Sequence, residues 1–228
     1  MSLKTIKLLL TCLLITFSVQ TLAAESIGKV VLAQGQPIVE RDNQHLPIKR
    51  NDKLYQKDRL ITPVGSRLLI KLKDKTTVSL AENTVFELSR YTFGKKKSDV
   101  SFKMIKGAFR TLTGAIGKQA NPKFEIHTPL ATIGVRGTEF WGGMIFSDAL
   151  DVTMLEGKGV YITNEFGTVD ITRPGEGTMV KQGMAPSDVS VWTNEKLKKA
   201  AAATAVGSPG NTDDENNLDL FQLMNEAY

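Results

Sequence analysis

Apolar and polar residues alternate along most of this chain, in short segments that recur from residue 27 to about residue 182. Successive side chains of a β-strand point to opposite faces, so each such segment buries one face and exposes the other. In residues 67–73, for example, Leu68, Ile70 and Leu72 fall on one face. The same alternation predicts further strands at residues 76–80, 85–91, 99–104, 123–127, 151–154, 159–163 and 168–172.

Turn-forming residues separate these segments, and no helical period lies between them. Strands at intervals of about 8–12 residues are typical of all-β folds. Alternation also favours sheets with one wet face over a parallel α/β sheet. We therefore expect residues 25–190 to form an all-β domain, an antiparallel-rich β-sandwich or β-roll of many short strands. The turns are expected at residues 73–75, 82–83, 94–97, 156–159, 164–167 and 173–175.

Residues 1–24 have the features of a cleavable signal peptide. Lys4 and Lys7 precede an uncharged apolar run that is short for a membrane span, and small residues follow it. Cleavage is expected after Ala24, with Ala23 as the alternative site; an uncleaved N-terminal anchor is the other reading. Cleavage would leave a periplasmic or secreted protein that is not integral to the membrane and has no cysteine, because Cys12 is the only one.

Residues 191–228 are expected to form a short helix, an acidic linker and a C-terminal tail. Thr193 or Asn194 fits an N-cap, and Gly207 fits a helix stop. The last 22 residues contain five acidic residues and no lysine or arginine. Leu220, Leu223 and Met224 have the spacing of one helix face, so the tail either folds onto the body or docks on a partner.

The sequence singles out no catalytic residue, metal site or cofactor. The two histidines, His45 and His127, lack a metal-ligand spacing, and the acidic stretch at residues 212–217 lacks the glycine of a calcium loop. There is no nucleophile elbow and no phosphate-binding loop, and no pair of carboxylates stands out. Most function classes that depend on such motifs are therefore not predicted.

Several basic residues fall at strand positions that the alternation places outward, residues 95–97 are expected at the tip of a hairpin, and the net charge is +5. Such charges discourage edge-to-edge aggregation. The alternative is a surface that binds anionic glycan or lipid headgroups. An exported protein is not expected to bind nucleic acid. The positions are Lys71, Lys73, Lys75, Lys95, Lys96, Lys97, Lys103, Lys106 and Arg110.

The stretch TPLATIGVRGTEF, residues 128–140, interrupts this regular pattern. Glycines within strands mark bends, bulges or close approach of another backbone, which we expect of Gly134 and Gly137. Arg136 and Glu139 are expected to pair with each other or with backbone groups at that bend. Arginine does not deprotonate, so the pair is not suited to acid–base chemistry. Arg136 could alternatively contact a partner.

The order of the segments resembles the FecR domain, the periplasmic domain of bacterial iron-transport regulators and of many exported proteins. The resemblance covers about residues 28–182, and includes Thr62-Pro63, the D-x-T-x-V-x-L pattern at 74–80, residues 106–109, 156–160 and 174–177. It implies an all-β domain that binds partners rather than catalyses. The most specific positions, structural or partner-contacting, are Thr128, Pro129, Gly134, Arg136, Gly137, Thr138, Glu139 and Phe140.

In the regulator branch, the resemblance implies a signal passed from an outer-membrane receptor to a sigma factor. This chain instead has an expected cleavable signal, which indicates a stand-alone exported type that contacts an envelope protein. A module that binds carbohydrate or peptidoglycan is a second hypothesis, because the body is basic and Trp141 and Trp192 could stack on sugars. The place of Trp141 in a strand also fits a core position. An enzyme acting on envelope polymers is the third.

Overall fold

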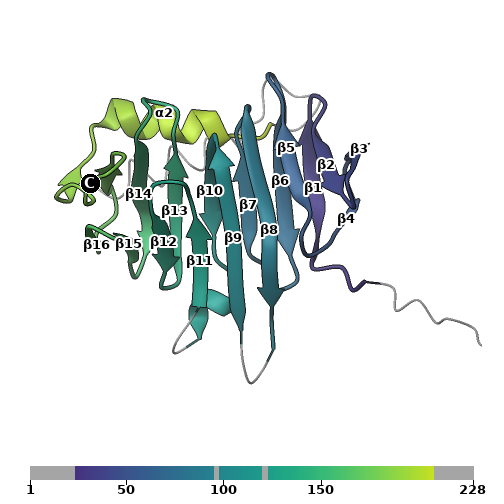
Figure 1. Ribbon diagram of the computed structural model, residues 1–228, viewed down its shortest axis with the longest axis horizontal. Coiled ribbons are helices and arrows are strands. Elements are labelled where there is room, and N and C mark those ends of the chain that lie inside the picture. Colours follow the sequence, from purple (N-terminus) through teal and green to yellow (C-terminus); the bar gives the residue numbers. More distant parts are fainter. Residues whose placement is uncertain (1–23, 95–97, 120–122, 208–228) are drawn as a thin grey trace, which may run out of the picture.

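The computed structural model describes residues 24–94, 98–119 and 123–207 (Figure 1). The expected signal peptide, apart from Ala24, lies outside the described residues. So do Lys95, Lys96 and Lys97, the acidic linker and the C-terminal tail.

Two nine-stranded sheets face each other, which confirms the all-β prediction. Sheet A contains, in spatial order, β18 (Ser190–Val191), β17 (Glu176–Val180), β14 (Leu150–Gly157), β13 (Thr138–Gly143), β10 (Ala108–Leu112), β7 (Thr77–Leu80), β6 (Arg67–Leu72), β1 (Gly28–Gln34) and β4 (Lys53–Leu54). Sheet B contains β16 (Gly167–Ile171), β15 (Val160–Asn164), β12 (Thr132–Val135), β11 (Lys123–His127), β9 (Asp99–Lys106), β8 (Thr84–Thr92), β5 (Arg59–Thr62), β2 (Ile38–Arg41) and β3 (Gln44–Pro47).

The chain passes back and forth between the two sheets, usually leaving an antiparallel hairpin in one before it crosses to the other. β6 and β7 pair in sheet A, for example, and β8 and β9 then pair in sheet B. Among the described strand pairs, only β9 and β11 run parallel. The strands therefore accumulate along one long axis. Within each sheet their order in space follows their order in sequence, except that β4 lies outside β1 and β3 lies outside β2 (Figure 1).

The inner faces of both sheets form one hydrophobic core, as the alternation predicts. Leu68, Ile70 and Leu72 of β6 are buried in it. Five phenylalanines link the sheets through ring contacts, with centroid distances from 5.6 to 5.9 Å between neighbours. Mutually tilted or edge-to-face rings at this spacing add to the stabilisation from area burial. They are Phe86, Phe102 and Phe124 of sheet B and Phe109 and Phe140 of sheet A.

Buried threonines hold the places where the chain crosses from one sheet to the other. The Thr84 hydroxyl accepts from the backbone N–H of Ala108 and donates to its carbonyl, both at 3.1 Å. The Thr62 hydroxyl likewise accepts from Thr84 N–H at 3.1 Å and donates to Ala81 O at 2.5 Å. These bonds satisfy backbone groups that the sheet ladders leave unpaired at a crossing.

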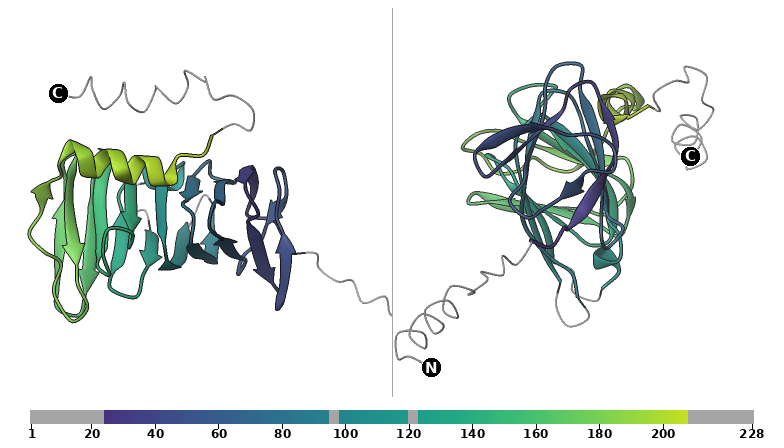
Figure 2. Two further views of the ribbon diagram at one scale, coloured as in Figure 1. Left: turned by 90° about the horizontal axis from the view of Figure 1, so that it is seen from above. Right: turned by 90° about the vertical axis from the view of Figure 1, so that its right-hand side faces the viewer.

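The α-helix α2 (Asn194–Thr204) lies against the outer face of sheet A (Figure 2). The Thr193 hydroxyl accepts from Lys196 N–H at 3.3 Å, which confirms the predicted N-cap. The helix ends at Thr204, before the predicted stop at Gly207. A short 3-10 helix, η1 (Ile116–Lys118), connects β10 to β11. None of the helices in the described part of the chain has the length and apolar character needed to cross a membrane.

Candidate interaction surface and the motif corner

Thr128 and Pro129 form the turn that joins β11 to β12. The Thr128 hydroxyl accepts from the N–H groups of Leu130 and Ala131, at 3.2 and 3.1 Å, and donates to Ala131 O at 2.8 Å. A threonine that folds back on its own turn in this way replaces backbone partners that the loop lacks. Pro129 is exposed at the turn. These two residues therefore fix the hairpin that leads into the glycine-containing strand.

Gly134 lies on β12 directly opposite Tyr161 of β15, whose ring crosses over it. A Cβ atom at position 134 would overlap that ring. The Tyr161 hydroxyl donates to Glu125 Oε1 at 3.3 Å, and the Arg136 guanidinium lies 5.5 Å from the ring centroid. Burial and then the Glu125 carboxylate raise the pKa of Tyr161, while Arg136 opposes the rise. Gly134 thus makes room for a tyrosine that joins three strands.

Arg136 and Gly137 are the corner at which the chain leaves sheet B for sheet A. Gly137 has φ +72°, and a Cβ there would overlap the carbonyl oxygen of Gly117. The next corner repeats the arrangement, because a Cβ on Gly157 (φ +118°) would lie 2.6 Å from the carbonyl oxygen of Gly137. The backbones of three successive corners, at Gly117, Gly137 and Gly157, therefore lie in direct contact. Only glycine permits so close an approach.

Thr138 holds this corner against its two neighbours. Its hydroxyl donates to Gly159 O at 2.9 Å and accepts from Gly159 N–H at 3.1 Å. The Thr113 hydroxyl accepts from Thr138 N–H at 3.0 Å and donates to Thr138 O at 3.2 Å. Phe140 follows and packs edge-to-face on Phe109 in the core. The motif thus joins three crossings and the core.

The predicted contact between Arg136 and Glu139 is wrong. Arg136 Nη1 lies 3.2 Å from Asp170 Oδ1, whereas Glu139 Oε1 accepts from Arg110 Nε at 2.7 Å. The corner between the two residues is the reason: Arg136 follows a strand of sheet B and Glu139 belongs to sheet A. Their side chains therefore lie on different outer faces of the molecule, although they are three residues apart in the sequence.

Charged side chains form a ladder across the outer face of sheet B, which sequence reasoning missed. From β2 to β9 the neighbours alternate in sign: Glu40–Arg59 (3.2 Å), Arg59–Glu87 (3.7 Å) and Glu87–Lys103 (3.8 Å). On β3, the His45 ring lies 3.6 Å from Glu40 and extends the row. The strand register sets these side chains opposite one another. The only signal in the sequence is the polar half of each alternating segment, which does not say which strands are neighbours.

The ladder continues on the far side of β9 with the side chains around the motif. His127 Nε2 lies 3.7 Å from Glu125 Oε2, and His127 Nδ1 is 2.9 Å from the Thr132 hydroxyl. Tyr161, Arg136 and Asp170 complete it on β15, the corner and β16. Within residues 24–94, 98–119 and 123–207, no three His, Cys, Asp or Glu side chains gather as a metal site would require.

The apolar residues beside this ladder are also outward. Ile38, Ile61 and Val85 lie opposite one another on β2, β5 and β8 and are half-buried. Ile105, on the outward side of β9, is 42% exposed. No α-helix lies on this face in the described part of the chain, whereas α2 covers part of the other sheet (Figure 2). We call the ladder and this apolar row together the sheet B face.

Both tryptophans are buried beneath or beside α2. Trp141, at 0% exposure, and Trp192, at 7%, meet edge-to-face at 6.0 Å between ring centroids. Trp141 projects from the outer face of sheet A, so the helix rather than the inter-sheet core buries it. Neither ring offers an open face to a sugar. The predicted stacking of these two rings on sugars, one of the two observations that motivated the carbohydrate hypothesis, is therefore contradicted.

A buried carboxylate accounts for the D-x-T part of the sequence pattern. Asp74, at 1% exposure, accepts from Thr76 N–H (3.2 Å), the Thr76 hydroxyl (2.7 Å) and the Tyr91 hydroxyl (3.0 Å). Burial, followed by the charge of Asp74, raises the pKa of Tyr91 well above its usual value of 10.0. Tyr91 belongs to β8 and Asp74 to the β6–β7 turn, so this bond ties the two sheets together.

Residues 58–158 match the family model described as FecR protein. The match contains all of residues 128–140, and it covers fewer than half of the 228 residues. The resemblance that the sequence suggests over residues 28–182 is therefore matched over a shorter stretch. A protein of Treponema pallidum (strain Nichols), described as an uncharacterized protein, is 31% identical over 113 residues, or 49% of this chain and 16% of that protein.

A solved structure from Parabacteroides distasonis ATCC 8503, described as a putative anti-sigma factor, has a similar fold. Its TM-score is 0.50 at 18% identity, with 61% of this chain and 62% of that chain covered. A second structure with the same description gives a TM-score of 0.49. Identity this low shows the fold alone. The chain also spans less than two thirds of that structure and a small part of the Treponema protein.

Proposed function

We propose that this chain is a non-enzymatic, exported binding domain that contacts a protein of the bacterial envelope through the sheet B face and acts in envelope signalling. In this proposal residues 1–24 direct the chain to the periplasm and are then removed. The FecR-matching segment supports the signalling context. The single observation that carries the binding role is the open sheet B face, where a charged ladder runs beside an outward apolar row.

The composition of this face favours a protein partner. Protein–protein interfaces combine apolar residues with a polar, hydrogen-bonding rim, and they are no more apolar as a whole than the rest of the surface. Ile105 is exposed next to Lys103, and the half-buried Ile61 and Val85 continue the apolar row. A surface that binds only polyanions would need cations in excess, yet Glu40 and Glu87 neutralise Arg59 and Lys103 here.

Binding to the envelope fraction with matched surface variants tests this proposal. Ile105→Glu places a charge on the sheet B face. Leu112→Glu is the control, because Leu112 is 49% exposed, against 42% for Ile105, and lies on the outer face of sheet A. The full chain is used to recover proteins from solubilised envelope, at several salt concentrations, and recovered proteins are compared between variants.

We expect one protein that is recovered with the wild type and with Leu112→Glu but is lost with Ile105→Glu. Loss with both variants, or with neither, would contradict the assignment of the sheet B face. Recovery of no protein at any salt concentration would contradict the binding function itself. Cell fractionation and the N-terminal mass of the exported chain test the location separately.

A further inference from the structure

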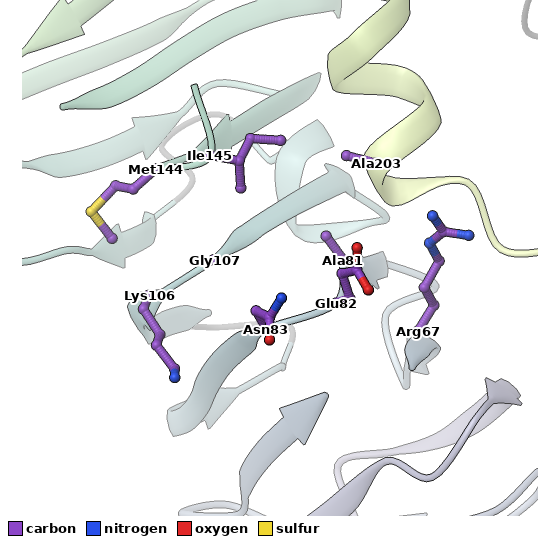
Figure 3. A pocket seen from close by; sticks show the side chains of 9 residues that line it. All are labelled: Arg67, Ala81, Glu82, Asn83, Lys106, Gly107, Met144, Ile145 and Ala203. Atoms are coloured by element: carbon purple, nitrogen blue, oxygen red, sulfur yellow. The ribbon is translucent and has the colours of Figure 1, made fainter. Parts of the chain in front are cut away.

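A pocket of about 450 Å³ opens beside the last turn of α2 (Figure 3). Ala203 of the helix, Arg67 of β6 and Ala81 line one side of it. Lys106, Met144 and Ile145 line the other side. The walls therefore offer two cations together with apolar surface, and Ile145 is 41% exposed. The pocket adjoins the end of the sheet B face, because Lys106 follows Ile105 on β9, but it shares no residue with that face.

The cations of this pocket lack acidic partners within the described residues. The Nε atom of Arg67 is buried and makes no hydrogen bond there, and neither Arg67 nor Lys106 forms an ion pair. The one carboxylate in the wall, Glu82, already accepts from Gly65 N–H at 2.7 Å. The pocket is therefore chemically matched to a ligand that brings carboxylates.

The chain itself supplies such a ligand close to the pocket. Gly207 is the last described residue and follows Ala203 by four positions, so the chain leaves α2 at the pocket wall. Asp213, Asp214 and Glu215 follow after five intervening residues, and the apolar Leu218, Leu220 and Phe221 come after them. An extended chain spans up to about 3.3–3.6 Å per residue, which lets this segment reach any wall of the pocket.

We propose that residues 213–221 of the same chain occupy this pocket. One or more carboxylates of residues 213–215 accept hydrogen bonds from Arg67 and neutralise Lys106. The apolar side chains that follow cover Met144 and Ile145. Arginine is suited to the contact, because its planar fork matches a carboxylate with two parallel hydrogen bonds. The acidic segment then continues the cover of sheet A that α2 begins.

Hydrogen–deuterium exchange of the full chain, read on peptides from residues 208–228, tests this occupancy. We expect slowed exchange in the wild type and roughly tenfold faster exchange in Arg67→Glu, the factor expected from one lost hydrogen bond to a charged group. Combining Arg67→Glu with the reversal of residues 213–215 to lysine should restore the slow exchange. Lys181→Glu, an exposed charge reversal beyond β17 of the same sheet, is the control and should change nothing.

Peptides from β6 and β9 in the same experiment report whether each variant is folded. If Arg67→Glu unfolds the chain, the exposed Lys106→Glu takes its place, with the same expected loss. Exchange at the rate of an unstructured peptide in the wild type would overturn the proposal. The proposal would also be overturned if exchange in residues 208–228 stayed slow in both Arg67→Glu and Lys106→Glu. If exchange in this segment became slower as the protein concentration rose, the segment would bind a second copy of the chain. That result would also overturn the proposal.

Discussion

A side chain would meet an obstacle at both Gly134 and Gly137, but of a different kind at each position. Gly134 has ordinary strand geometry, and a Cβ there meets the far end of the Tyr161 side chain, which can rotate away. Gly137 has φ +72°, and its Cβ would meet the backbone of Gly117, which cannot move without shifting a whole corner. The cost of a side chain therefore differs between two glycines that look equivalent in the sequence.

Gly137→Ala should destabilise the protein more than Gly134→Ala. A non-glycine residue held in this backbone region costs about 1–3 kcal/mol before the clash with Gly117 is added. Gly134→Ala should cost less, and Tyr161→Ala in the same chain should recover most of its loss. Urea denaturation of the four chains measures these differences. A larger loss at Gly134, or no recovery with Tyr161→Ala, would contradict the steric account.

Arg136→Ala should leave the free energy of unfolding within about 1 kcal/mol of the wild type, because its partner Asp170 and Arg136 itself are both about half exposed. Arg110→Ala should cost more, about 1–3 kcal/mol, since it strips a hydrogen bond from Glu139, which is 15% exposed. Thermal or urea unfolding compares the two. Equal losses would show that exposure does not decide the strength of these pairs.

Tyr91 should make the fold sensitive to alkaline pH. Its pKa is raised in the folded state, so the stabilisation is complete below the usual tyrosine value of 10.0 and falls as pH rises above it. The loss from this residue should reach about 1.4 kcal/mol one pH unit above that value. Denaturation of the wild type and of Tyr91→Phe, at pH 9 and at pH 11, isolates the contribution.

At neutral pH, Tyr91→Phe removes one donor from the buried Asp74 and should cost about 1–3 kcal/mol. Between pH 9 and pH 11, however, the variant should lose less stability than the wild type. The same loss in both chains would mean that other groups govern the alkaline response.

At the scale of elements, α2 decides which part of sheet A is accessible. Lys196 Nζ lies 2.5 Å from Asp151 Oδ1 and 4.0 Å from the centre of the Trp192 ring. The Asp151 side chain is 2% exposed. Trp192 in turn packs over Gly177 of β17, where a Cβ would have no room. The pair formed with the buried Asp151 carboxylate and the two tryptophans therefore anchor the helix on sheet A.

Lys196→Met should destabilise the protein by about 3 kcal/mol, because it leaves the buried carboxylate of Asp151 without its partner. Adding Asp151→Asn should recover part of the loss, since the amide carries no charge. Urea denaturation followed by tryptophan fluorescence measures both chains, with Lys198→Met on the exposed side of α2 as the control. A smaller loss than in Lys198→Met would show that the pair does not hold the helix.

At the scale of the whole molecule, the crossings between sheets organise the fold. On one side they are joined by Thr62 and Thr84, and on the other by Thr113 and Thr138. Because each crossing bonds to the next one along the axis, the sheets grow as a single stack with one continuous core. This connectivity leaves the outer faces free to differ: one carries α2, and the other carries the charged ladder.

The alternating period by itself determined the all-β class, eight of the strand segments and the residues in them that face the core. The burial of Leu68, Ile70 and Leu72 could be predicted from neighbouring residues alone, because side chains two positions apart on a strand point to the same face. The N-cap at Thr193 could likewise be predicted from the adjacent residues. The sequence motif also indicated the FecR-like segment, although over a wider range than residues 58–158.

Only the tertiary structure decided the partners of charged residues and the cover of each face. Arg136 meets Asp170 and Glu139 meets Arg110 because a corner sends the two strands into different sheets. Trp141 is outward on its strand yet fully buried, since a helix fifty residues later covers it. Strand register and sheet membership depend on pairing between residues far apart in the chain. A local alternation of apolar and polar residues does not determine that pairing.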